Sequence, residues 1–134
     1  MTVSLSAVHV LVDDPDAALG FYRDALGLTV RQDVRNGDFR WITLAGSRQP
    51  DVAIVLSQPH AGRSRRDGDA LAALLAKGEL RPVHLRSEDL DATFAQVTTV
   101  PGVEVLEEPA TRPWGARDAA VRDPAGNLIR IEQK

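Results

Sequence analysis

Residues 6–17 read SAVHVLVDDPDA and residues 81–92 read RPVHLRSEDLDA, so His9 and His84 have the same local setting 75 positions apart. The same shift aligns further identical residues in both halves of the chain. These pairs are Val8 and Val83, Asp14 and Asp89, Asp16 and Asp91, Ala17 and Ala92, Gly27 and Gly102, Val30 and Val105, Ile54 and Ile129, and Gln58 and Gln133. One shift that holds without a gap to the end of both halves predicts two copies of one supersecondary unit.

Each copy is expected to fold as β-α-β-β-β. Residues 5–12 alternate between two sets of side chains, which is the period of a strand. Residues 13–27 carry an aspartate cap, a proline in the first turn and a closing glycine, which indicates a helix. The other predicted strands of the first copy are 28–34, 39–45 and 51–57; the second copy has strands at 82–87, 103–108, 116–122 and 127–133 and a helix at 88–97.

The composition limits the class of protein. The 134 residues are expected to form one domain, with module one over 1–58, a linker with a short helix over 59–80 and module two over 81–134. Mixed charges with a net charge of −3 argue against a nucleic-acid partner. The absence of cysteine excludes disulfides and thiolate chemistry. No apolar run reaches the roughly 20 residues of a membrane span, so we expect a cytoplasmic protein without a membrane partner.

One motif lies after the first strand and another at the end of the second module. They are FYRDALGL at residues 21–28 and DPAGNLIRIEQ at residues 123–133. With this spacing the chain resembles the vicinal oxygen chelate superfamily, which includes glyoxalase I, extradiol dioxygenases, and fosfomycin- and bleomycin-resistance proteins. The resemblance implies an α+β fold in which the mixed sheets of two tandem βαβββ modules form a curved bowl, with helices outside and the ligand on the concave face. It also implies a homodimer, because small members of the family usually combine modules from both chains.

The resemblance places four metal-ligand positions on this chain. In metal-using relatives a histidine lies seven residues before the aspartate that opens the first helix, which gives Ala7 here and Pro82 in the second copy. The ligand after the turn glycine falls on Arg130, and the remaining ligand falls on Val55. Alanine, valine and proline side chains offer no donor atom, and arginine brings a fixed positive charge. We therefore predict no conventional metal site and no cofactor.

A displaced metal site is the alternative. His9, His84 and Glu132 each lie two residues beyond one of these positions, and a step of two along a strand keeps the same face. Two histidines and one carboxylate suit Fe(II), Mn or Zn. The same two histidines are our candidate catalytic residues for metal-free proton transfer. In the simplest interpretation they are a repeat-derived pair that lines the bowl.

The strand alternation predicts which side chains line the concave face. The candidates combine aromatic surface with a few polar groups, which is typical of small-molecule pockets. The predicted ligand-binding residues are Trp41, Thr43, Ser57, Arg86, Trp114, Arg130 and Glu132. Trp114 belongs to the sequence RPWGARD at 112–118, which is either a lid or a plain turn. Alternatively, Trp41 packs in the core or a dimer interface, and Arg130 and Glu132 neutralise each other.

Three functional hypotheses follow, and we prefer the first. The first is a metal-independent protein that sequesters a small planar or anionic molecule, as the bleomycin-resistance branch of the family does. The second is a metal-dependent lyase, isomerase or dioxygenase that uses the displaced site. The third is a metal-free enzyme in which His9 or His84 transfers a proton while Arg130 holds an anionic or enolate oxygen.

Overall fold

The computed structural model describes residues 2–134. The chain forms two compact units, one that ends at Ala72 and one that runs from Ala73 to Lys134. The boundary between them falls inside helix α2 (Arg65–Ala76). Each unit contains its own four-stranded sheet.

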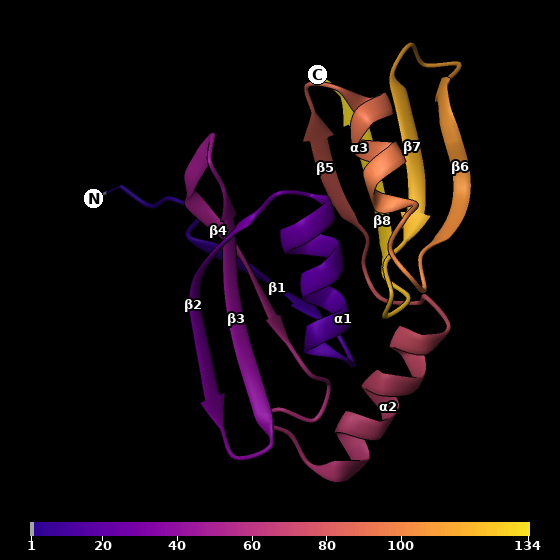
Figure 1. The fold of residues 1–134 in the computed structure, drawn as a ribbon. Coiled ribbons are helices and arrows are strands. Elements are labelled where there is room, and N and C mark those ends of the chain that lie inside the picture. Colours follow the sequence, from indigo (N-terminus) through magenta and orange to yellow (C-terminus); the bar gives the residue numbers. More distant parts are fainter. Residues whose placement is uncertain (1) are drawn as a thin grey trace. The chain divides into compact units, whose positions relative to one another are not determined.

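The sheet of the first unit is built from one continuous stretch of chain (Figure 1). Its elements are β1 (Ala7–Leu11), α1 (Pro15–Leu19), the π-helical segment η1 (Gly20–Ala25), β2 (Thr29–Asn36), β3 (Phe39–Gly46) and β4 (Gln49–Ser57). The strand order is β1-β4-β3-β2, with β1 parallel to β4 and the other pairs antiparallel. The first strand therefore pairs with the last strand of its module, and the predicted β-α-β-β-β unit is confirmed.

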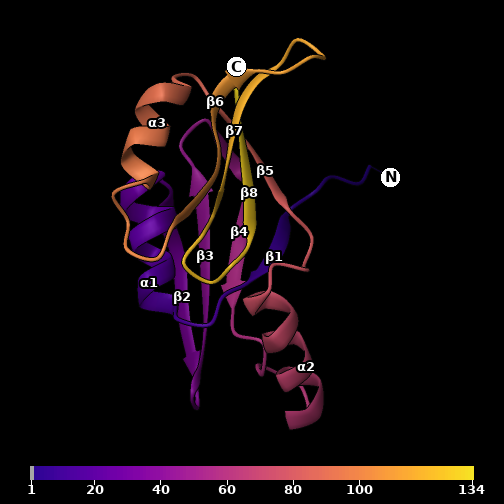
Figure 2. The same cartoon turned by 90° about the vertical axis from the view of Figure 1, so that its right-hand side faces the viewer.

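The second unit repeats this arrangement. Its elements are β5 (Val83–Ser87), α3 (Leu90–Val97), β6 (Glu104–Thr111), β7 (Arg117–Arg122) and β8 (Leu128–Gln133), and the strand order is β5-β8-β7-β6. Strands β5 and β8 are parallel, and the other two pairs are antiparallel. In Figure 2, α3 lies on one side of this sheet and leaves the other side uncovered by helices of the same unit. The predicted α+β class with two tandem modules is confirmed.

The first helix begins where the sequence predicts. Asp14 is its N-cap, and the Asp14 carboxylate accepts hydrogen bonds from the main-chain N–H groups of Asp16 and Ala17 at 3.0 and 3.2 Å. Pro15 occupies the first turn, where its missing N–H costs nothing. The helix changes to a π-helical segment at Gly20, which the sequence pattern did not predict, and the chain leaves it at Gly27 with a φ of 76°. A positive φ of this kind is what glycine tolerates best.

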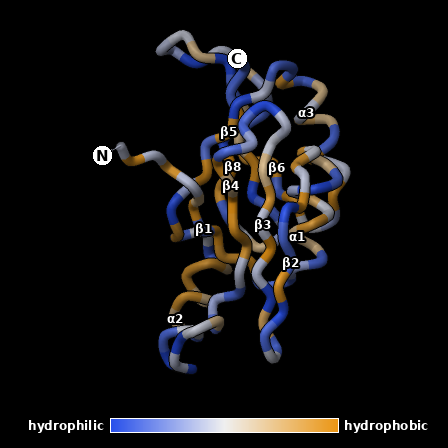
Figure 3. Tube along the Cα trace, turned by 90° about the vertical axis from the view of Figure 1, so that its left-hand side faces the viewer, coloured by the Kyte–Doolittle hydropathy of each residue, from blue (hydrophilic) through white to orange (hydrophobic). Residues whose placement is uncertain are grey.

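The core of each unit lies on one face of its sheet. Apolar residues alternate with polar ones along the strands, and Figure 3 shows that the tip of the β2–β3 hairpin is hydrophilic. In the first unit Phe21 and Tyr22 of η1 are fully buried with Ile42, Leu44 and Leu56. In the second unit the corresponding buried residues are Leu90, Val97, Ala119, Val121, Ile129 and Ile131. Val8 is exposed, whereas Val10, on the same face of the same edge strand, is buried.

The shift of 75 residues predicts the pairing register of the first and last strands of each module, but it does not predict the register of the strand that precedes the last one. Val8 pairs with Ile54 and Val83 pairs with Ile129, which are the same positions after a shift of 75. However, Thr43 pairs with Val55, twelve residues on, whereas Ala120 pairs with Arg130, ten residues on. Strand β7 is therefore displaced by two residues relative to a gapless repeat. Because the displacement is even, each side chain keeps the same face of the sheet.

Candidate functional site

The four inherited metal positions do not fit a metal ion. Ala7, Val55 and Pro82 have no side-chain donor atom. Arg130 on β8 directs its guanidinium to carboxylates of its own unit. A cationic side chain held in this way opposes a dication at the same place. Among residues 2–134, no group of three or more His, Cys, Asp or Glu side chains is placed to hold a metal ion.

The helix-free face of the first sheet carries several of the predicted ligand-binding residues. His9 on β1 pairs with Val55 on β4, which in turn pairs with Thr43 on β3, so these three side chains form one row across the sheet. Leu11 and Ser57 form the next pair on the same face. His9 is exposed, Val55 and Thr43 are half-buried, and Ser57 is buried. The row joins an imidazole and a hydroxyl to an otherwise apolar surface.

Trp41 lies on this same face of the first sheet. It is two residues from Thr43 on β3 and pairs with Val34 on β2. Trp41 is half-buried, and Val34 is an exposed apolar residue beside it. A partly accessible indole next to exposed aliphatic surface offers a flat area on which a planar molecule can stack.

The corresponding face of the second sheet is charged. Cross-strand pairing gives one row from Glu107 through Ala120 and Arg130 to His84. A second row runs from Asp118 through Glu132 to Arg86. The two sheets therefore share a backbone plan but present different surfaces, one largely apolar and the other ionic.

Four side chains on this charged face form an ion cluster, which consists of Glu107, Arg112, Asp118 and Arg130. Arg112 Nε lies 2.6 Å from Asp118 Oδ1, and Arg130 Nη1 lies 3.2 Å from Asp118 Oδ2. Both guanidinium groups also contact Glu107 Oε2, at 3.1 Å from Arg112 Nη2 and 3.2 Å from Arg130 Nη1. The cluster contains two cations and two anions, so it is neutral overall.

The ion cluster sets the ionisation of its members. Burial acts to raise the pKa of Asp118, but the hydrogen bond from Arg112 and the charge and hydrogen bond of Arg130 together outweigh burial and hold this pKa below its usual value. The hydrogen bond to Glu107 is the main reason that the pKa of Arg130 lies above its usual value. Asp118 is therefore ionised in the neutral range and does not act as a general acid there.

Arg86 and Glu132 pair with each other rather than with the cluster. Arg86 Nη2 lies 2.7 Å from Glu132 Oε1, and Arg86 Nε donates to the same oxygen at 2.8 Å. Sequence reasoning offered Arg130 as a partner of Glu132, but each of these two residues binds another side chain instead. Glu132 remains on the same face as His84, as the displaced-site hypothesis requires, with its carboxylate engaged by an arginine.

Trp114 lies at the tip of the hairpin that joins β6 to β7, and its residue surface is 70% exposed. Figures 1 and 2 show this hairpin extending from the end of the sheet. Its base is closed by the main-chain N–H of Arg112, which donates to Ala116 O at 2.7 Å. Arg117, in the same segment 112–118 that was predicted to be a lid or a turn, pairs with Asp91 at 2.8 Å.

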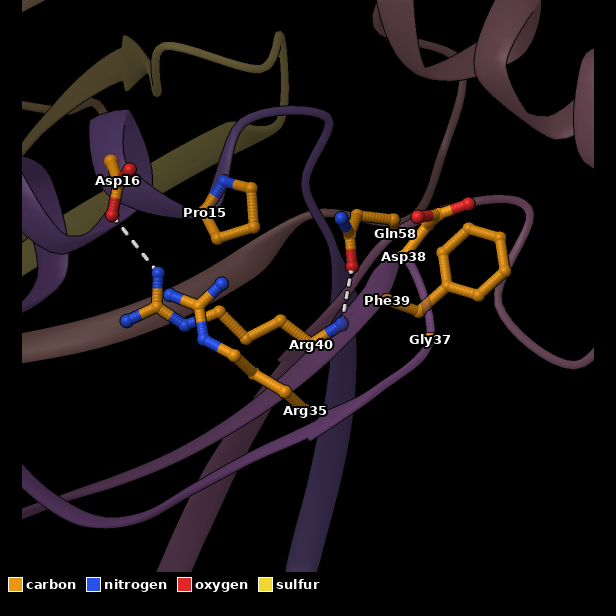
Figure 4. Close-up of a pocket in the computed structure, with 8 residues that line it drawn as sticks. All are labelled: Pro15, Asp16, Arg35, Gly37, Asp38, Phe39, Arg40 and Gln58. Atoms are coloured by element: carbon orange, nitrogen blue, oxygen red, sulfur yellow. Dashed lines mark hydrogen bonds and ion pairs between the residues drawn. The ribbon is translucent and has the colours of Figure 1, made fainter.

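A separate pocket of about 320 Å³ lies at the end of the β2–β3 hairpin (Figure 4). It is lined by Pro15, Asp16, Arg35, Gly37, Asp38, Phe39, Arg40 and Gln58. Arg40 Nη1 donates to Asp16 Oδ1 at 2.9 Å, and Arg40 Nη2 lies 2.6 Å from Asp33 Oδ2. Arg40 already binds Asp16 and Gln58 in this pocket, which makes the pocket a weaker candidate for a planar ligand than the face with Trp41.

The C-terminal motif that suggested the family has a structural role. The Asp123 carboxylate accepts hydrogen bonds from the main-chain N–H groups of Ala125, Gly126 and Asn127 at 2.8 to 3.0 Å, and from Asn127 Nδ2 at 2.9 Å. Asp123 and Asn127 are both buried. These two residues shape the turn before β8, so this part of the motif, DPAGN, has a structural role.

The paired βαβββ modules and these motifs define a vicinal oxygen chelate protein. A family model of the Glyoxalase/Bleomycin resistance protein/Dioxygenase superfamily matches residues 4–131, and the chain belongs to this superfamily.

Several relatives match over nearly their whole length. The crystal structure of UcmS2 is 31% identical, with a TM-score of 0.84 and complete coverage of both chains. TnmS3, an antibiotic binding protein from Streptomyces sp. CB03234, is 29% identical with a TM-score of 0.73, over 99% of this chain and 98% of that one. Uncharacterized protein YurT of Bacillus subtilis (strain 168) is 28% identical over 98% of this chain and 100% of its own length.

Sequence reasoning missed three members of the ion cluster. Asp118, Arg112 and Glu107 were not among the predicted site residues, although Arg130 was. The available signal was the pattern ARDAAVR at 116–122, in which Asp118 is a charged residue inside a run that otherwise reads as a buried strand. A buried carboxylate needs a cationic partner, and Arg112 is six residues upstream.

Proposed function

We propose that this protein binds and sequesters a small planar molecule without the help of a metal ion. The observation that carries the proposal is the helix-free face of the first sheet, on which half-buried Trp41 lies beside exposed Val34 and on the same side as Thr43, Ser57 and His9. The indole supplies a stacking surface, and the hydroxyl and imidazole groups supply orientation.

The residues at the four positions where metal-using relatives have metal ligands support a role without metal. Three of them carry no donor atom, and Arg130 is fixed in an ion cluster. Such a chain keeps the family fold while its chemistry depends on contacts with the ligand. Because TnmS3 is an antibiotic binding protein of similar sequence and fold, we extend the proposal to a compound of that general kind.

The assembly and location belong to the same proposal. We propose a homodimer in the cytoplasm, in which sheets of two chains enclose the ligand, and Trp114 on its exposed hairpin is the candidate to close over it. The described residues 2–134 include no helix whose length and apolar character would allow it to cross a membrane.

Binding of Nile red, a neutral planar fluorophore, tests this function. We expect saturable binding to protein dialysed against EDTA, with no change after addition of Fe(II), Mn(II), Ni(II) or Zn(II). Trp41→Ala should weaken binding about tenfold, since stacking of aromatic groups contributes up to about 1.5 kcal/mol. Phe39→Ala is the matched control, because Phe39 is an aromatic residue of the same strand that lines the polar pocket.

The alternatives give different results. Binding that disappears with EDTA and returns with one metal, together with loss in His84→Ala, would favour the metal-dependent hypothesis. Native mass spectrometry of the same samples reports the number of subunits and any metal or small molecule that purifies with the protein. A monomer without bound dye would contradict the proposal.

A further inference from the structure

We infer that the second unit contains a binding site for a carboxylate group of the ligand, formed by Arg112 and Arg130, and that Glu107 occupies this site when no ligand is bound. This inference rests on the proposed binding function and adds a charged group to the expected ligand.

The geometry at Glu107 is that of a bound anion. One oxygen, Glu107 Oε2, lies 3.1 Å from Arg112 Nη2 and 3.2 Å from Arg130 Nη1. Arginine is favoured for carboxylate recognition in proteins because its charged guanidinium presents several fixed N–H donors, and two such groups converge on this oxygen. The side chain of Glu107 therefore occupies the place that a carboxylate of a small molecule would take.

Exposure separates the fixed part of the cluster from the exchangeable part. The exposed fractions of the side chains are 5% for Asp118, 17% for Arg112, 26% for Arg130 and 43% for Glu107. Asp118 binds both arginines from the buried side and fixes their positions. Arg112 is held further by hydrogen bonds to the main-chain oxygens of Glu108 and Asp118. Glu107 is the outermost member of the four.

Charge explains why the site needs an anion. Without Glu107 the two arginines and Asp118 carry a net charge of +1 in a partly buried place, which is unfavourable unless an anion or water compensates it. A ligand carboxylate that replaces Glu107 restores neutrality and releases Glu107 to solvent. The exchange needs no change in the buried part of the cluster.

The backbone around Glu107 is suited to this exchange. Strand β6 is an edge strand, and its pairing with β7 is irregular on both sides of Glu107, between Val105 and Glu107 and between Glu107 and Ala110. Irregular pairing at sheet edges often redirects a side chain next to a functional site. Ala120, between Glu107 and Arg130 in the same row, is too small to block access to the guanidinium groups.

Titration with sodium benzoate, followed by NMR of the arginine Nε–H groups, tests the site. Glu107→Gln should bind benzoate at least tenfold more tightly than the wild type, because an internal competitor that fills the site nine-tenths of the time weakens apparent affinity by that factor. The signals of Arg112 and Arg130 should shift on binding. Glu108→Gln removes the same charge from the next residue of β6 and should change affinity less than twofold.

A second variant confirms the location. Adding Arg130→Gln to Glu107→Gln should abolish the gain in affinity, while circular dichroism and thermal unfolding report that both variants are folded. Equal benzoate affinity in Glu107→Gln and the wild type would overturn the inference, and so would an equal gain in Glu108→Gln.

Nile red binding separates this inference from the proposed function. If Nile red binds and responds to Trp41→Ala while benzoate does not respond to Glu107→Gln, only the carboxylate site is wrong. If neither probe binds the wild type or the variants, both proposals are wrong.

Discussion

Arg112 binds Asp118 through both its carboxylate and its backbone, with Nε 2.6 Å from Asp118 Oδ1 and Nη2 3.0 Å from the Asp118 main-chain oxygen. The two residues lie on either side of the β6–β7 hairpin. One arginine therefore neutralises a buried carboxylate and closes the hairpin that carries Trp114. Each also binds a second member of the ion cluster, so loss of either partner leaves the cluster with a net charge in a partly buried place, which is more costly than loss of an exposed ion pair.

Acid should destabilise the protein partly through Asp118. Its pKa is lowered in the folded state, whereas an unfolded aspartate titrates near about 3.9. The stabilisation is therefore complete above the unfolded pKa and is lost as the pH falls through the folded pKa. Urea unfolding between pH 7 and pH 2 should show this loss, and Asp118→Asn should reduce its pH dependence.

The contribution of Asp118 to the pH dependence of stability can be compared with that of two other aspartates. Asp33, whose pKa is also lowered by its hydrogen bond to Arg40, should preserve part of the acid sensitivity in Asp118→Asn. Asp51→Asn, on an exposed position of β4, is the charge-matched control. An identical pH dependence in the wild type and Asp118→Asn would show that the buried ion pairs do not contribute.

Asp123→Ala should destabilise the second unit by about 2 to 4 kcal/mol. The substitution removes a buried acceptor of three main-chain N–H groups and one side-chain amide, and a buried donor without a partner is costly. Chemical denaturation measures the change. Asp51→Ala provides the comparison at an exposed site, and a loss of similar size there would contradict the explanation.

Gly126→Ala and Gly37→Ala compare two glycines with positive φ. Gly126 has a φ of 111°, and a Cβ at this position would lie 2.5 Å from the main-chain oxygen of Leu75. Gly37 has a φ of 62°, with nothing within 4 Å of such a Cβ. Thermal unfolding should show a loss of about 1 kcal/mol for Gly37→Ala and about 2 to 4 kcal/mol for Gly126→Ala. Equal losses would mean that the contact with Leu75 is unimportant.

Arg40→Gln should destabilise the first unit by about 1 to 2 kcal/mol, because the Arg40 side chain is largely buried and joins Asp33 on β2 to Asp16 at the start of α1. Arg35→Gln, at an exposed position near the end of β2, is expected to change stability by less than about 0.5 kcal/mol. Urea denaturation of both variants tests this, and Arg35→Gln should be the less affected of the two.

Periodicity and the repeat were sufficient to predict the two modules. Strand alternation, the Asp14 cap and Gly27 are local signals, so they can be read without knowing the fold. The parallel pair formed by the first and last strands of each module also has the same register after a shift of 75 residues. The predicted roles of His9 and His84 remain predictions, because the structure shows only their positions on the open faces of their sheets.

The ion cluster could not be predicted in the same way. Its members come from β7, β8, the irregular edge strand β6 and the hairpin after it, and they meet only because three strands pair in one particular register. In a gapless repeat Ala116 would be the residue of the second unit that corresponds to Trp41 of the first. Because β7 is displaced by two residues, Asp118 has that position instead. Nothing in the local pattern of β7 indicates that displacement.

The even displacement of β7 limits how the hairpins of this chain can change in length. Removal of two residues between β7 and β8 keeps Asp118 and Ala120 on the face with Glu132 and Arg130. Removal of one residue would turn Ala119 and Val121 out toward water and place a charged residue against the helix. Only changes by an even number of residues in this hairpin keep the two faces of the sheet unchanged, so a search for natural length variants among relatives should find odd changes depleted.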